Sequence, residues 1–243
     1  MRIAAAQTLP VQGDIQTNIE NHNKLINLAL SNGADTIIFP ELSLTGYEPT
    51  LAKELATTLD DSRLDEFQTI SDANRVIIGV GIPLKNDPLP TISMVIFQPD
   101  RPRQVYSKQY IHADEEPYFV NGRNPTTTLP NHPNIALAIC YEISIPQHAQ
   151  AAHQNGAEIY IASVAKFVNG IDKSLMRLSE IARTYSMTVI MSNCTGLCDG
   201  EQCAGKSAVW NNKGEPLGQL NDAGEGLLIF NTDTGEIGSI LQN

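Results

Sequence analysis

The run Ile135-Ala136-Leu137-Ala138-Ile139 is fully apolar and ends at Cys140. A short, uninterrupted apolar run is typical of a strand that is buried on both faces of a helix-covered sheet. Pro146–Gln154 follows with a helical pattern, and Asn155-Gly156 can end that helix because glycine accepts the left-handed conformation. Glu158–Ala162 is the next strand candidate, so this part of the chain predicts a β–α–β unit.

A second unit of the same design lies near the start of the chain. Ile3–Gln7 is a predicted strand, Asn18–Leu30 a predicted helix, and Thr36–Phe39 a compact apolar run that follows Asn32-Gly33. Two β–α–β units of similar sequence indicate two layered halves. We therefore expect an α/β protein with mixed sheets and helices packed on their outer faces.

The remaining apolar runs supply further elements of these sheets. No Gly/Ser-rich linker divides the chain, so residues 1–243 are predicted to form a single domain. A helix is expected at Ile171–Tyr185, and strands are expected at Arg75–Gly81, Thr91–Phe97, Gln104–Ser107, Thr188–Ser192, Ala208–Trp210 and Leu227–Phe230.

Composition and charge exclude several classes of protein. The chain has 27 acidic and 16 basic residues and a formal charge of −11, which disfavours nucleic acid and anionic membrane as partners. No apolar stretch approaches the roughly 20 residues that span a bilayer. The start lacks the pattern of a signal peptide, and four cysteines are too few for a disulfide scaffold of this length. We expect a cytoplasmic protein with reduced thiols.

Three polar residues directly follow predicted strands, where reactive groups gather in α/β sheets. They are Glu41, Lys108 and Cys140. A thiolate is a strong nucleophile, a carboxylate can accept its proton, and a lysine can stabilise the charge that develops on a carbonyl oxygen. Together these residue types form a set for acyl transfer that needs neither histidine nor metal, although each taken singly has an ordinary structural explanation.

The segments around these residues resemble the signatures of the nitrilase superfamily, the carbon–nitrogen hydrolases. The three motifs occur in the expected order, and weaker similarity extends over nearly the whole chain. They are Phe39-Pro40-Glu41-Leu42-Ser43-Leu44-Thr45-Gly46-Tyr47, then Tyr106-Ser107-Lys108-Gln109-Tyr110-Ile111-His112, and Ala138-Ile139-Cys140-Tyr141-Glu142.

The resemblance implies a role for each motif residue. Glu41 would be the general base, Lys108 the stabiliser of the tetrahedral intermediate and Cys140 the nucleophile, while the backbone N–H of Tyr141 would help to bind the oxyanion. A second active-site glutamate would be Glu115, with the adjacent Glu116 as an open alternative. The implied fold is a four-layer α-β-β-α sandwich that forms a homodimer and requires no cofactor.

The implied reaction is hydrolysis of a small amide through a Cys140 thioester. Nitrilase and N-carbamoyl hydrolase activities of the same superfamily remain alternatives. Tyr47, Glu142 and Lys166 lie in or near loops after strands and are candidates to contact the substrate, the latter two if it is charged. A catalytically silent binding protein on the same fold is a further alternative, which the presence of Glu41, Lys108 and Cys140 disfavours.

A second motif points to another class of protein. Gly200–Ser207 formally matches the phosphate-binding pattern G-x-x-x-x-G-K-S, which would make the chain a nucleotide-binding protein. A true phosphate loop leaves a strand and opens a helix, whereas Ala208–Trp210 and the turn after it favour a strand and hairpin. We therefore expect the match to be accidental.

Three of the cysteines lie close together in the sequence, as Cys194, Cys198 and Cys203. Structural zinc usually has four protein ligands, and no nearby histidine supplies the fourth. The sequence therefore predicts cysteines that serve packing or lie in a loop, and no metal site.

Overall fold

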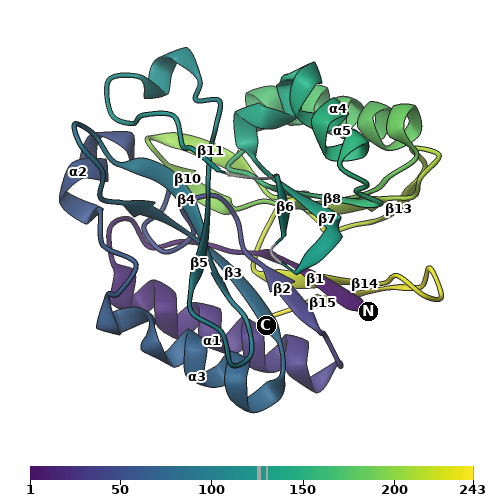
Figure 1. Ribbon diagram of the computed structural model, residues 1–243, viewed down its shortest axis with the longest axis horizontal. Helices are drawn as coiled ribbons and strands as arrows, with labels where there is room; N and C mark the ends of the chain where they lie inside the picture. The colour runs from purple at the N-terminus through teal and green to yellow at the C-terminus, as the bar shows by residue number, and fades with distance from the viewer. Residues whose placement is uncertain (125–126, 130, 243) are drawn as a thin grey trace.

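Two β-sheets lie one above the other, with helices on the outer face of each, in the computed structural model, which describes residues 1–124, 127–129 and 131–242 (Figure 1). In the described residues, the strand order of the first sheet is β15-β14-β1-β2-β3-β4-β5 and that of the second is β13-β12-β9-β8-β7-β6. Helices α1 and α3 cover the first sheet, and α4 and α5 cover the second (Figure 1). The predicted four-layer α-β-β-α sandwich is confirmed.

The predicted elements occur with bounds close to those of their apolar runs, and the structure adds elements that were not predicted. The helices are α1 (Ile15–Ser31), α2 (Ala52–Leu55), α3 (Asp65–Asn74), α4 (Pro146–Gln154) and α5 (Ile171–Tyr185). The first sheet contains β1 (Arg2–Gln7), β2 (Thr36–Ile38), β3 (Ile77–Leu84), β4 (Thr91–Phe97), β5 (Gln104–Ser107), β14 (Gly226–Asn231) and β15 (Ile237–Leu241). The second contains β6 (Thr128–Leu129), β7 (His132–Ile139), β8 (Ile159–Ser163), β9 (Thr188–Ser192), β12 (Ala208–Trp210) and β13 (Pro216–Gln219), and β10 (Thr195–Cys198) with β11 (Glu201–Ala204) forms a separate hairpin.

The two predicted β–α–β units form, one in each sheet. β1 pairs parallel with β2, and β7 pairs parallel with β8. The helices between them end at glycines with positive φ, Gly33 at 74° and Gly156 at 86°, as the Asn-Gly pairs predict.

The period of two along a strand divides its side chains between two cores. In β1, Ile3 and Ala5 pack between the sheets, whereas Ala4 and Ala6 face the core beneath α1 and α3. Two hydroxyls also tie the sheets together, because Ser163 Oγ donates to the Phe39 carbonyl at 2.8 Å and Ser192 Oγ to the Ala6 carbonyl at 2.5 Å. This packing fixes the carboxyl ends of strands from both sheets relative to one another.

The segment Gly200–Ser207 does not have the context of a phosphate loop. It contains β11 and leads into the strand β12 rather than into a helix. Lys206 itself has a positive φ of 57° and its side chain lies 3.8 Å from Asp172. The structure agrees with the predicted strand and hairpin.

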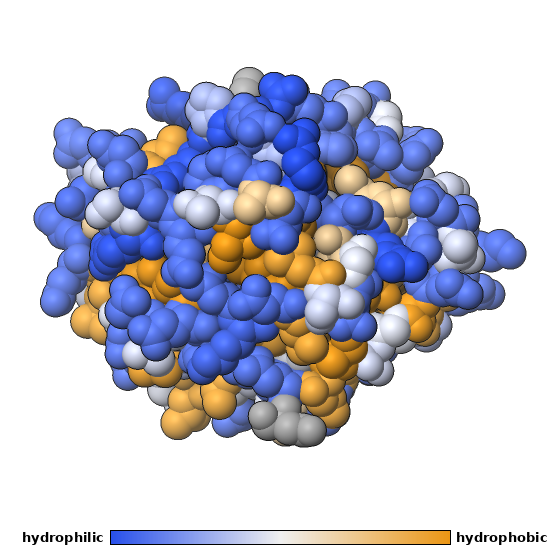
Figure 2. All heavy atoms as spheres, turned by 90° about the horizontal axis from the view of Figure 1, so that it is seen from below, coloured by the Kyte–Doolittle hydropathy of each residue, from blue (hydrophilic) through white to orange (hydrophobic). Residues whose placement is uncertain are grey.

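Seen from the side of α1 and α3, polar residues cover much of the surface, and apolar groups show in a central band between them (Figure 2). Within the described ranges, none of the helices has the length and apolar character needed to cross a bilayer.

Candidate active site

Glu41, Lys108 and Cys140 come together between the two sheets. Glu41 follows β2 and Lys108 follows β5 in the first sheet, while Cys140 follows β7 in the second. All three are buried, with exposed fractions of 2%, 0% and 7%. The side chains that the sequence singled out therefore meet at the place where the sheets face each other.

Lys108 is the centre of a buried charge cluster. Its Nζ donates to Glu41 Oε1 at 2.8 Å and to Glu115 Oε1 at 2.6 Å. Two carboxylates on one ammonium give the cluster a net negative charge when both are ionised. Because burial makes an unpaired charge costly, each member depends on the others to remain in the interior.

Glu115 is held from three sides, and Glu116 is not part of the cluster. Besides Lys108, the Tyr47 hydroxyl donates to Glu115 Oε1 at 3.0 Å and the His112 N–H to its Oε2 at 2.7 Å. Glu116 instead lines an open surface cleft. The structure thus brings Glu115, of the two candidates, to Lys108.

Cys140 has a strained backbone at the point where β7 ends. Its φ is 44°, in the left-handed region that a residue with a Cβ rarely adopts, and a short 3₁₀ turn, Cys140–Ser144, begins there. The Sγ atom lies 3.9 Å from the Ala165 carbonyl oxygen. Within the described residues Glu41 Oε2 has no hydrogen-bond partner.

Glu142 lies beneath the nucleophile rather than beside a substrate. Its carboxylate is fully buried and accepts hydrogen bonds from Ile139 N–H at 2.7 Å, Gln109 N–H at 2.6 Å and the Tyr106 hydroxyl at 2.8 Å. His148 continues this network through the same hydroxyl. The expected contact with a charged substrate does not fit this position, because protein donors occupy the carboxylate.

Burial and neighbouring charges shift the pKa values of Cys140, Glu41 and Lys108. Burial raises the pKa of Cys140, as does the charge of Glu41, whereas Lys166 and Lys108 lower it. Burial also raises the pKa of Glu41, against the opposing effect of Lys108. Burial opposes the charge on Lys108, but Glu41 and the other anions outweigh it and raise its pKa, so this lysine stays protonated. The resting site thus holds a thiol, a cation and a base of raised proton affinity.

Tyr141, the residue after the nucleophile, and Lys166 line a cleft of about 870 Å³. The backbone of Lys166 is fixed by Asn193, whose Oδ1 accepts its N–H at 2.8 Å. The cleft contains more basic than acidic side chains, although the chain is acidic overall, and Glu180, which also lines it, pairs with Arg177 at 2.7 Å. Its basic members are Lys166, Lys173, Arg177 and Arg183.

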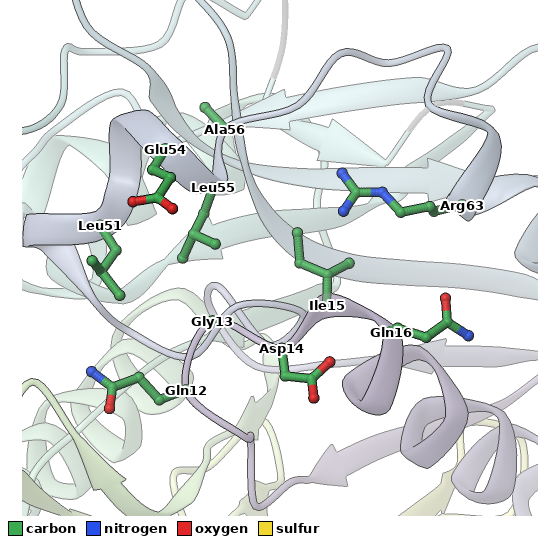
Figure 3. Close-up of a pocket in the computed structure, with 10 residues that line it drawn as sticks. All are labelled: Gln12, Gly13, Asp14, Ile15, Gln16, Leu51, Glu54, Leu55, Ala56 and Arg63. Atoms are coloured by element: carbon green, nitrogen blue, oxygen red, sulfur yellow. The ribbon is translucent and has the colours of Figure 1, made fainter.

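Another pocket, at the start of α1, contains none of the predicted site residues. It has a volume of about 620 Å³. The loop before α1, the start of α1, α2 and the residues next to it, and the side chain of Arg63 line it (Figure 3). The Arg63 side chain is already paired with Asp61 at 2.6 Å. Nothing in this pocket supplies the nucleophile and base that the cluster around Cys140 combines.

Sequence reasoning missed Gly81, which lets the Glu41 loop approach β3. A Cβ at this position would lie 2.4 Å from both Leu42 N and the Pro40 carbonyl oxygen. We expect Gly81→Ala to destabilise the fold by about 1–3 kcal/mol and to lower the rate of the chemical step by moving Glu41. Denaturant unfolding and kcat measure the two effects. Gly238→Ala in β15 is the matched control, because a Cβ there meets nothing within 4 Å; equal stability of the two variants would contradict the prediction.

Comparisons with known proteins agree with this geometry. The model of the carbon–nitrogen hydrolase family matches residues 2–242. A glutamine-dependent NAD(+) synthetase from Thermotoga maritima is 25% identical over 89% of this chain, and an (R)-stereoselective amidase from a Pseudomonas species is 27% identical over 67% of it. The chain spans only 39% of the synthetase and 60% of the amidase.

Solved structures share the architecture. An amidase from Nesterenkonia sp. AN1 superimposes with a TM-score of 0.85 at 23% identity, covering 95% of this chain and 92% of that one. At this identity the likeness establishes the common fold. Together with the family match along almost its whole length, it shows that the chain belongs to the carbon–nitrogen hydrolase family.

Proposed function

We propose that the protein hydrolyses a small amide through a thioester on Cys140. The observation that carries this proposal is the buried contact of Lys108 with both Glu41 and Glu115 beside the thiol. Acyl transfer needs a nucleophile, a base and a stabiliser of negative charge, and this cluster contains one of each.

The proposed reaction has two halves. Glu41 accepts the thiol proton as Cys140 attacks the carbonyl carbon, and Lys108 with the Tyr141 N–H stabilises the resulting oxyanion. Glu41 returns the proton to the leaving nitrogen, so that ammonia or an amine departs and a thioester remains. Glu41 then removes a proton from water as it attacks the thioester, the bond to the Cys140 sulfur breaks to release the acid, and Glu41 returns the proton to that sulfur.

Relatives support an amide as the substrate. One structure of the Nesterenkonia amidase contains butyramide, and another carries the acetamide group of fluoroacetamide on its active-site cysteine. The test is release of ammonia from a panel of small amides, with nitriles and N-carbamoyl compounds as parallel arms. Turnover of only the nitriles or only the N-carbamoyl compounds would show that one of these, and not an amide, is the substrate class. Absence of turnover with all three classes of compound would contradict the proposal.

The pH dependence of this activity follows from Glu41. Its base form is required, and burial raises its pKa above the ordinary value of 4.5, so activity is complete above the raised pKa and is lost as the pH falls through it. We expect the acid limb of kcat/KM above pH 4.5. Residual activity of Glu41→Gln should lack this limb. An acid limb at or below the ordinary value, in protein that remains folded, would contradict the assignment.

The basic cleft favours substrates that carry negative charge in addition to the amide. We expect Lys166→Ala to raise KM for acidic amides more than for neutral amides of similar size, because only the former interact with its ammonium group. Lys213→Ala, an exposed turn lysine, is the control. Equal changes in KM for both substrate types would argue against an anionic subsite at Lys166.

A further inference from the structure

The three remaining cysteines form a cluster that the proposed reaction does not use. The Sγ atoms of Cys194, Cys198 and Cys203 all lie within 4.8 Å of one another. The three residues are buried, with exposed fractions of 2%, 1% and 1%. Three thiols that converge in the interior are an arrangement that metal binding explains better than packing, because aliphatic side chains fill buried space equally well.

The hairpin β10–β11 produces this convergence. Asp199 and Gly200 have positive φ values of 50° and 74°, as the two-residue turn of a tight hairpin requires. Cys203 lies opposite Gly196, two residues from Cys198 along the same face. Cys194 reaches the pair from the residue before β10.

We propose that Cys194, Cys198 and Cys203 bind one thiophilic d¹⁰ metal ion, Zn²⁺ or Cu⁺. With metal–sulfur bonds of about 2.3 Å, three thiolates around one ion lie about 3.8–4.0 Å apart. The observed separations, within 4.8 Å, need only a small contraction. Soft thiolate ligands select these ions over the hard cations that carboxylates prefer.

The surroundings of the cluster favour a cation. Glu48 is 5% exposed. Its carboxylate accepts the Asp199 N–H at 3.1 Å and the Gln12 amide at 2.9 Å. Glu48 thus adds negative charge and braces the hairpin, as an outer-sphere partner of a metal site does.

The ligands of such an ion are thiolates rather than thiols. Metal binding converts each S–H to a metal–sulfur bond and releases its proton, so the affinity rises with pH. Three thiolates suffice for Cu⁺, whereas Zn²⁺ takes a fourth ligand such as water.

The test measures metal binding by reduced, metal-free protein. Zn²⁺ and Cu⁺ are titrated separately against chelators of known affinity, and Co²⁺ serves as a spectroscopic probe for the Zn²⁺ arm. We expect one equivalent of ion per chain and, with Co²⁺, sulfur-to-metal charge-transfer absorption that Zn²⁺ abolishes. The ion that binds more tightly identifies the occupant.

Variants assign the ligands. Cys198→Ser and Cys203→Ser should each weaken binding by more than the roughly 10–100-fold that loss of an outer-sphere partner costs. Cys140→Ser, which removes a buried thiol outside the cluster, should bind as the unmodified protein does. If a serine variant fails to fold, the charge-transfer absorption of the unmodified protein still reports thiolate ligation. Absence of stoichiometric binding of either ion, or binding abolished by Cys140→Ser alone, would overturn the proposal.

Discussion

Lys108→Met should destabilise the protein by about 3–5 kcal/mol, because it leaves two buried carboxylates without their cation. Glu41 and Glu115 both accept hydrogen bonds from Lys108 Nζ, and each is 2% exposed. The same change should lower kcat by about 10²–10³-fold, since it removes a stabilising charge from the oxyanion. Denaturant unfolding and steady-state kinetics measure the two effects.

The pH dependence of that loss distinguishes unpaired charge from lost packing. Burial and the charge of Glu115 raise the pKa of Glu41, and loss of Lys108 removes the charge that lowers it, so the folded state binds more protons than the unfolded chain. The deficit in stability should therefore be largest at high pH and shrink as the pH falls. Lys213→Met, at an exposed turn position, should change stability little. A deficit that is the same at all pH values would contradict an electrostatic cause.

Cys140→Ala should abolish turnover, with a fall in kcat of about 10⁴-fold or more, because no other group in the cluster can form the thioester. The variant should remain folded, since the change to alanine removes only one sulfur atom and leaves the charge pairs around Lys108 intact. Ammonia release and thermal unfolding measure the two quantities. Cys140→Ser, which nearly keeps the volume of the side chain, should also be inactive; full activity in either variant would contradict the mechanism.

The sequence predicts the architecture well because the buried strands are continuous apolar runs. β7 and β8 were expected at Ile135–Ile139 and Glu158–Ala162 and occur with bounds close to these. In contrast, α3 was missed because it carries few apolar residues, with Phe67 and Ser71 as its buried ones. The hairpin β10–β11 was missed although Asp199-Gly200 is a strong turn signal, and this omission hid the meeting of the cysteines.

Residues near the site were harder to assign, because adjacent side chains can face opposite sides. Glu115 and Glu116 are equivalent in sequence, and only the turn at Ala113–Glu115 directs the first of them to Lys108. Glu142 follows the nucleophile closely, yet the turn after β7 folds its carboxylate back onto the Ile139 N–H. The spacing of residues along the chain does not predict the direction of these side chains, because that direction depends on backbone angles such as the positive φ of Cys140.

Intact-protein mass spectrometry of acid-quenched reactions with the amide panel tests the central claim most directly. We predict a mass increase equal to the amide minus ammonia, located on Cys140 by peptide mapping, and transfer of the acyl group to added hydroxylamine. Cys140→Ala should show neither the adduct nor the hydroxamate. Amide turnover with an acyl group on a different residue, or undiminished turnover by Cys140→Ala, would contradict the account.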